Sequence, residues 1–106
     1  MDKVVVLGAG TMGRGIAQVS ALAGYPTVLT DISSEVLQSG VDGIQDFLAK
    51  GIARGKTTEA QRDQCMANLR WTTDLVEAAT GAELVIEAVP EVMSLKKQIF
   101  SQLDEL

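Results

Sequence analysis

Histidine is absent from this 106-residue chain, and cysteine is almost absent. Without histidine, the chain lacks the commonest general base and the commonest neutral metal ligand. The single cysteine, Cys65, excludes an intramolecular disulfide and has no second ligand at metal-binding spacing. We therefore expect no metal site and a reducing, cytoplasmic environment.

Positive charge and long apolar runs are also scarce. Lys and Arg total 9 against 14 Asp and Glu, a formal net charge of −5, which argues against nucleic acid or an anionic membrane as the main partner. The apolar run Val4–Leu7 is too short for a signal peptide, and no run approaches the ~20 apolar residues that span a bilayer. We expect one soluble globular domain over residues 1–106.

The first part of the chain predicts a strand, a helix and a second strand. Residues 3–7 form a β-branched apolar run, typical of a strand in a parallel sheet. A second extended run covers 26–30. The helix predicted between them ends at Gly24 and carries apolar residues at helical spacing, namely Met12, Ile16, Val19 and Ala23.

Two helices are predicted after the second strand. The first is capped by one of the serines at positions 33 and 34 and stops before Gly51. Gly40 and Gly43 weaken it slightly. A Thr58–Gln61 capping box begins the second helix, which reaches about Asn68. The first helix has an apolar face formed by Val36, Leu37, Val41, Ile44 and Leu48.

A short strand over 69–72, a short helix over 74–79 and a buried strand over 83–89 follow, and helical periodicity resumes from Ser94. A complete doubly wound dinucleotide-binding fold has two βαβαβ halves. The strands expected in this sequence are enough for little more than one of these halves. We expect an α/β, Rossmann-like doubly wound parallel sheet, truncated to roughly its first mononucleotide-binding half, with a helical insertion after the second strand.

A glycine motif marks the candidate site. Gly8, Ala9, Gly10, Thr11, Met12 and Gly13 follow the first strand directly and open the first helix, which is the context that a G-x-G-x-x-G match requires. There Gly8 permits a tight turn, Gly10 lets the backbone approach a pyrophosphate, and Gly13 lets the helix lie close to the strand. No lysine follows the last glycine, which excludes a P-loop. The motif predicts dinucleotide binding at a helix N-terminus.

Asp31 ends the second predicted strand, 18 residues after Gly13. This is close to the ~20 expected for a carboxylate that accepts hydrogen bonds from the adenosine ribose. A 2′-phosphate would meet Asp31 as a like charge, and residues 32–34 supply no arginine, so we expect NAD rather than NADP. FAD enzymes use the same fingerprint and remain an alternative.

Further polar candidates lie near the end of the chain. Glu87 and Glu91 flank Pro90 where the strand over 83–89 ends, at the sheet edge where open α/β sheets bind ligands. They are either an acid–base pair or one strand-end carboxylate and one carboxylate favoured by a helix N-terminus. Lys96 is placed to point into the same crevice.

These segments together resemble the amino-terminal part of 3-hydroxyacyl-CoA dehydrogenases, over essentially all 106 residues. The resemblance is carried by Gly8–Gln18, Asp31, Glu83–Glu91 and the run 95–100. The family oxidises the 3-hydroxyl of an acyl-CoA by passing hydride to NAD in fatty acid metabolism. The resemblance implies that the glycine motif holds the pyrophosphate, Asp31 the ribose, and Glu91 with Lys96 the nicotinamide half.

The resemblance also bears on the basic residues Lys50, Arg54 and Lys56, which are otherwise either a solvated loop or a site for an anionic substrate. It implies that Arg54 binds substrate, since Arg54 falls near a family lysine that contacts the phosphates of CoA. Phe47 stands where some members carry a CoA-contacting serine.

The resemblance places the family's catalytic histidine and its helper residues beyond residue 106, so we expect no catalytic residue in this chain. It implies an acyl-CoA substrate and a homo-oligomer for the full-length enzyme. Two alternatives stay open: the cofactor half of another β-hydroxyacid dehydrogenase, and a noncatalytic module that senses NAD.

We predict that the purified chain of residues 1–106 has no dehydrogenase turnover. Hydride departure from a secondary alcohol needs a base that accepts the hydroxyl proton, and no residue of this sequence matches the family's base. The measurement is NADH absorbance in the presence of NAD and 3-hydroxybutyryl-CoA. A rate above that of the protein-free mixture would contradict the prediction.

Overall fold

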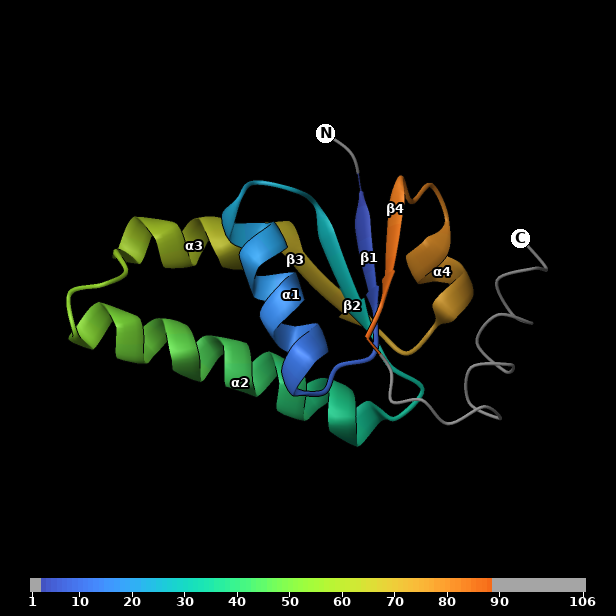
Figure 1. Ribbon diagram of the computed structural model, residues 1–106, viewed down its shortest axis with the longest axis horizontal. Helices are drawn as coiled ribbons and strands as arrows, with labels where there is room; N and C mark the ends of the chain where they lie inside the picture. The colour runs from blue at the N-terminus through green and yellow to red at the C-terminus, as the bar shows by residue number, and fades with distance from the viewer. Residues whose placement is uncertain (1–2, 89–106) are drawn as a thin grey trace.

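The computed structural model describes residues 3–88, which form an α/β fold around a parallel sheet (Figure 1). The sheet has the order β3-β2-β1-β4, and each neighbouring pair runs parallel. Its strands are β1 (Val4–Leu7), β2 (Thr27–Thr30), β3 (Leu69–Thr72) and β4 (Leu84–Glu87).

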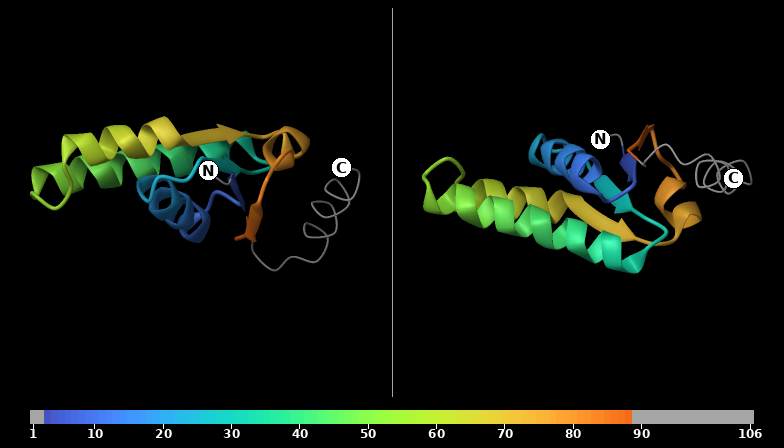
Figure 2. Two further views of the ribbon diagram at one scale, coloured as in Figure 1. Left: turned by 90° about the horizontal axis from the view of Figure 1, so that it is seen from above. Right: turned by 60° about the horizontal axis from the view of Figure 1, so that its bottom comes forward.

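Helices make every connection between these strands. The β1–β2 connection is α1 (Thr11–Leu22), and the β3–β4 connection is α4 (Leu75–Ala79). Two helices, α2 (Ser34–Ala53) and α3 (Glu59–Asn68), lie between β2 and β3. They run antiparallel and extend past the sheet as a helical hairpin (Figures 1 and 2). The Rossmann-like fold and the helical insertion after the second strand are therefore confirmed. Over residues 3–88, no helix is both long and apolar enough to cross a membrane.

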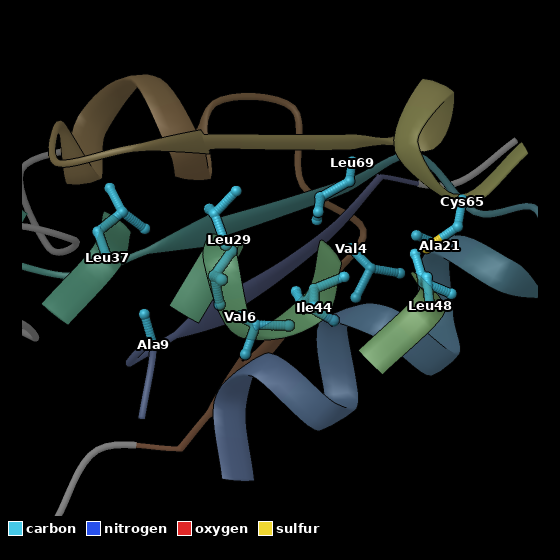
Figure 3. Packing of buried hydrophobic residues seen from close by; sticks show 12 residues of the cluster. Val4, Val6, Ala9, Ala21, Leu29, Leu37, Ile44, Leu48, Cys65 and Leu69 are labelled. Atoms are coloured by element: carbon cyan, nitrogen blue, oxygen red, sulfur yellow. The ribbon is translucent and has the colours of Figure 1, made fainter. Parts of the chain in front are cut away.

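Both faces of the sheet are covered, so the arrangement is doubly wound. Val4 and Val6 point into the larger core beneath α1 and α2 (Figure 3), whereas Val5 and Leu7 point into a smaller core beneath α4. This alternation follows from the period of two along a strand. All four residues of β1 are buried, as predicted for a strand in the middle of a parallel sheet.

The buried face of α1 differs from the expected one. Its buried residues are Gly13, Ala17 and Ala21, spaced four apart, whereas Met12 and Val19 are each 68% exposed. Small side chains allow the helix to lie close to the sheet. The larger apolar residues instead line an open groove between α1 and β4, together with Ile16, Leu84 and Ile86.

Two further boundaries differ from the prediction. α2 does not stop before Gly51 but runs to Ala53, and the Gly51 carbonyl accepts from the backbone N–H groups of Lys56 at 2.8 Å and Thr57 at 3.1 Å, which follow the helix. Val36, expected on the apolar face of α2, is 41% exposed.

The strand expected over 83–89 begins one residue later and is less buried than predicted, and its expected last residue, Val89, lies outside the described residues. β4 covers Leu84–Glu87, and Leu84 and Val85 are 52% and 41% exposed. The reason is that β4 lies at the edge of the described sheet, with β1 as its only neighbour among residues 3–88. Its apolar sequence indicates an interior strand, whereas residues 3–88 supply a neighbour on one side only.

α2 approaches the turn after β1 at Gly40. A Cβ at this position would stand 2.6 Å from the carbonyl oxygen of Ala9 and 3.2 Å from the Ala9 Cβ. Because the contacted oxygen belongs to the backbone, a side chain at position 40 would force α2 away from the turn. Gly40 is thus a packing residue and not merely a weak point in the helix.

We predict that Gly40→Ala lowers the free energy of unfolding by about 1–2 kcal/mol, because overpacking outweighs the gain of about 1 kcal/mol in helix propensity. Gly15→Ala is the matched control, since nothing lies within 4 Å of its added Cβ, and it should be neutral or stabilising. Urea unfolding followed by circular dichroism measures both. Equal stability of the two variants would show that the contact is easily relieved.

Candidate functional site

The turn between β1 and α1 has a different requirement at each glycine. Gly8 has φ of 104°, which favours glycine, and its N–H donates to the Thr30 carbonyl at 2.7 Å. A Cβ on Gly13 would stand 1.7 Å from the Gly8 carbonyl oxygen, so Gly13 lets α1 begin directly against the turn. A Cβ on Gly10 would meet no atom of residues 3–88 within 4 Å. The turn is therefore packed behind Gly8 and Gly13 and open in front of Gly10.

Among residues 3–88, no side chain caps the N-terminus of α1. Its N-cap residue is Gly10, without a side-chain hydrogen bond, and its first turn contains no acidic residue. Among the helices of residues 3–88 it differs in this from α2, α3 and α4, which are capped by Ser33, Thr58 and Asp74 and have an acid in the first turn. Free N–H groups and the positive end of the helix dipole thus remain available to an anion.

Asp31 lies beside this turn, as its position in the sequence predicts. Its Oδ2 accepts a hydrogen bond from the Ala9 N–H at 3.0 Å, and its Oδ1 accepts one from the Ser33 N–H at 2.9 Å. The carboxylate therefore ties the glycine turn to the start of α2. A carboxylate has about four lone-pair sites, so each oxygen keeps acceptor capacity for a ligand hydroxyl.

The other predicted site residues stand differently toward the turn. Arg54 is the exposed C-cap of α2, roughly 20 Å along the helix from Gly40 at a rise of about 1.5 Å per residue. Glu91 and Lys96 lie outside the described residues. Glu87 is the last residue of β4 and pairs in register with Leu7 of β1, so it lies at the carboxyl edge of the sheet.

Two other chemistries find no support over residues 3–88. No group of His, Cys, Asp and Glu there could hold a metal ion. Cys65 is buried in the core, where desolvation raises the pKa of its thiol. Burial keeps this thiol protonated and unreactive at neutral pH.

Sequence reasoning missed the part that α2 plays in supporting the turn. Gly40 contacts Ala9, and Gly43 contacts the Arg14 side chain of α1. The sequence does contain a sign of this close packing, namely two glycines three residues apart on one face of a long helix. The same pair can also be interpreted as glycines that only lower the stability of the helix. Only the tertiary structure shows which residues approach it.

Comparison with known proteins agrees with this geometry. Residues 3–106 match the family model described as 3-hydroxyacyl-CoA dehydrogenase, NAD binding domain. The chain is 43% identical to 3-hydroxyadipyl-CoA dehydrogenase of Escherichia coli over 106 residues, covering 100% of this chain and 22% of that protein. It is 39% identical to 3-hydroxybutyryl-CoA dehydrogenase of Mycobacterium tuberculosis, covering 100% and 37%.

A solved structure extends the likeness to three dimensions. The (S)-3-hydroxybutyryl-CoA dehydrogenase of Ralstonia eutropha superposes with a TM-score of 0.88 at 36% identity, over 99% of this chain and 37% of that one. The chain therefore spans well under half the length of each of these relatives.

We predict that Asp31→Ala destabilises the protein even without any ligand. The substitution leaves the N–H of Ala9, a residue only 2% exposed, without its acceptor, which costs about 1–3 kcal/mol. The measurement is the free energy of unfolding in urea.

The control for charge is Asp42→Ala, because this exposed carboxylate only accepts from the Gln38 amide at 2.9 Å. It should change stability by less than about 0.5 kcal/mol. If Asp31→Ala were as stable as this control, the link between turn and α2 would not contribute to stability.

Proposed function

The chain belongs to the 3-hydroxyacyl-CoA dehydrogenase family and matches its NAD-binding domain. On that premise we propose that it binds NAD for oxidation of a 3-hydroxyacyl-CoA to the 3-oxoacyl-CoA. The observation that carries the proposal is the space in front of Gly10, which residues 3–88 leave open, at a helix N-terminus that no side chain of these residues caps. A diphosphate supplies the acceptors that these N–H groups lack.

Each residue of the turn has a role in the proposed binding. Gly10, Thr11 and Met12 present backbone N–H groups to the pyrophosphate, and Gly8 and Gly13 hold those groups in place from behind. Asp31 accepts hydrogen bonds from the ribose hydroxyls with the lone pairs that Ala9 and Ser33 leave unused. Its negative charge disfavours the 2′-phosphate of NADP.

The bound nicotinamide supplies a hydride acceptor, while the proteins of this family supply its orientation. In the proposed reaction the hydroxyl proton goes to a base outside residues 1–106, because this sequence contains no histidine. The substrate class rests on the relatives, whose names specify hydroxyadipyl-CoA and hydroxybutyryl-CoA. Arg54, Glu91 and Lys96 keep their proposed contacts with substrate and nicotinamide.

We predict that Gly10→Ala weakens NAD binding by about tenfold or more without lowering stability. Its methyl group enters the space proposed for the diphosphate, yet meets no protein atom within 4 Å. Isothermal titration with NAD measures the Kd, and a urea melt measures stability.

Gly15→Ala is the matched control, since it makes the same change in equally open surroundings farther along α1 and should bind NAD like the unaltered chain. Parallel titrations with NADP and FAD test cofactor choice, and we expect NAD to bind most tightly. Equal affinity of Gly10→Ala and Gly15→Ala for NAD would refute the proposed position of the diphosphate.

A further inference from the structure

Two parts of the protein hold the peptide unit between Gly8 and Ala9. A Cβ on Gly13 would stand 1.7 Å from the Gly8 carbonyl oxygen, so this oxygen faces α1. The Ala9 N–H of the same unit donates to Oδ2 of Asp31 at 3.0 Å. Both polar groups of this unit therefore have a neighbour in the protein.

The next peptide unit, between Ala9 and Gly10, has a protein neighbour at its carbonyl. A Cβ on Gly40 would stand 2.6 Å from the Ala9 carbonyl oxygen and 3.5 Å from the carbonyl carbon, so the backbone of α2 lies directly against this group. Ala9 is 2% exposed and Gly40 is buried, whereas Gly10 is exposed. The unit is thus covered at its Ala9 end and open at its Gly10 end.

The geometry of the peptide bond links these two ends. No peptide bond among residues 3–88 is cis, and in a planar trans unit the C=O and the N–H point in opposite directions. Because the Ala9 carbonyl faces α2, the Gly10 N–H points away from α2. The contact at Gly40 therefore fixes the direction of a donor on the far side of the peptide.

An added methyl group at position 40 has no room in this arrangement. α2 is held by Leu37, Val41 and Ile44, which are buried in the larger core. The methyl group would either lift α2 from Ala9 or rotate the Ala9–Gly10 peptide. In both cases the carbonyl loses the surface that fixes it, and the Gly10 N–H loses its direction.

We infer that Gly40 is a positioning residue for the cofactor, because it aims the Gly10 N–H at the diphosphate through the Ala9–Gly10 peptide. The inference rests on the proposed function, which assigns the N–H groups of Gly10, Thr11 and Met12 to a diphosphate. A donor that is already fixed in direction binds an anion more tightly than one that has to be turned into place. The packing of α2 thereby sets the affinity of the diphosphate site.

The test is isothermal titration with NAD. We expect Gly40→Ala to weaken NAD binding about tenfold, as for the weakening of one charge-assisted hydrogen bond. Gly43→Ala is the matched control, because it adds the same methyl group one turn later in α2 but meets side-chain atoms of Arg14, whose flexible end can move aside. It should bind NAD as the unaltered chain does. Circular dichroism checks that both variants are folded at the temperature of the titration.

A second readout follows the Gly10 amide directly, because a merely structural role of Gly40 would lower stability without affecting that amide. In proton–nitrogen NMR spectra, inorganic pyrophosphate should move the Gly10 amide proton downfield in the unaltered chain and in Gly43→Ala, and should move it less in Gly40→Ala. Adenosine has no diphosphate and should bind all three proteins alike, because the Ala9 N–H that holds Asp31 belongs to the preceding peptide unit.

The outcomes separate this inference from the proposed function. Weaker NAD binding and a smaller pyrophosphate shift in Gly40→Ala alone support it. NAD affinity equal to that of Gly43→Ala overturns it, and so do equal losses of NAD and adenosine affinity, which would assign the effect to Asp31. If the unaltered chain binds pyrophosphate but not NAD, the proposed function fails and the pyrophosphate series still decides the inference. If it binds neither, both fail.

If Gly40→Ala does not fold, hydrogen exchange of the unaltered chain takes its place. By reciprocity, a ligand that fixes the Gly10 N–H also stabilises the contact at Gly40. NAD should therefore slow amide exchange in residues 37–44 of α2 more than in α4, which covers the other face of the sheet. Equal slowing in α2 and α4 would overturn the inference.

Discussion

The close contact between Gly8 and Gly13 is the constraint on which the rest of the structure depends. The carbonyl oxygen of Gly8 occupies the place that a side chain at position 13 would take, so α1 begins immediately behind the end of β1. This forces small residues along the buried side of α1, where Ala17 and Ala21 follow Gly13 at intervals of one turn. The larger side chains of Met12 and Val19 lie outside this close contact and are exposed.

Glycines at close contacts also fix the position of α2. Gly40 rests on the backbone of Ala9, so α2 approaches the glycine turn closely at this position, and one turn later Gly43 leaves room for the Arg14 side chain of α1. Asp31 adds a polar link at the start of that helix. Sterics and hydrogen bonds therefore act together: the glycines allow the approach and the carboxylate holds it.

Local signals were sufficient to predict the elements that depend on neighbouring residues in the sequence. The strand before Gly8, the Thr58–Gln61 capping box and the left-handed turn at Gly24 each combine residues a few positions apart, and the structure shows all of them. The family resemblance and the Rossmann-like sheet are likewise confirmed. Cofactor and substrate contacts remain predictions, and Glu91 and Lys96 lie outside the described residues.

Features that depend on distant partners could not be predicted in this way. Periodicity finds an apolar side of α1 but not which side meets the sheet, and here the small residues meet it. The role of Gly40 depends on Ala9, which lies 31 residues earlier. The exposure of β4 depends on its place in the strand order, whereas its sequence alone resembles that of an interior strand.

The two hydrogen bonds of Asp31 also explain how one carboxylate can stabilise the fold and still have acceptor sites for the proposed ligand. Each carboxylate oxygen accepts a single backbone N–H, so a second acceptor site on each stays open. A ribose that used those sites would not have to displace the bonds to Ala9 and Ser33. The turn is thus held in its open shape before any ligand arrives, and a ligand meets N–H groups that need no reordering. Such preorganisation lowers the entropic cost of binding, and it depends on the carboxylate for which we propose the ribose contact.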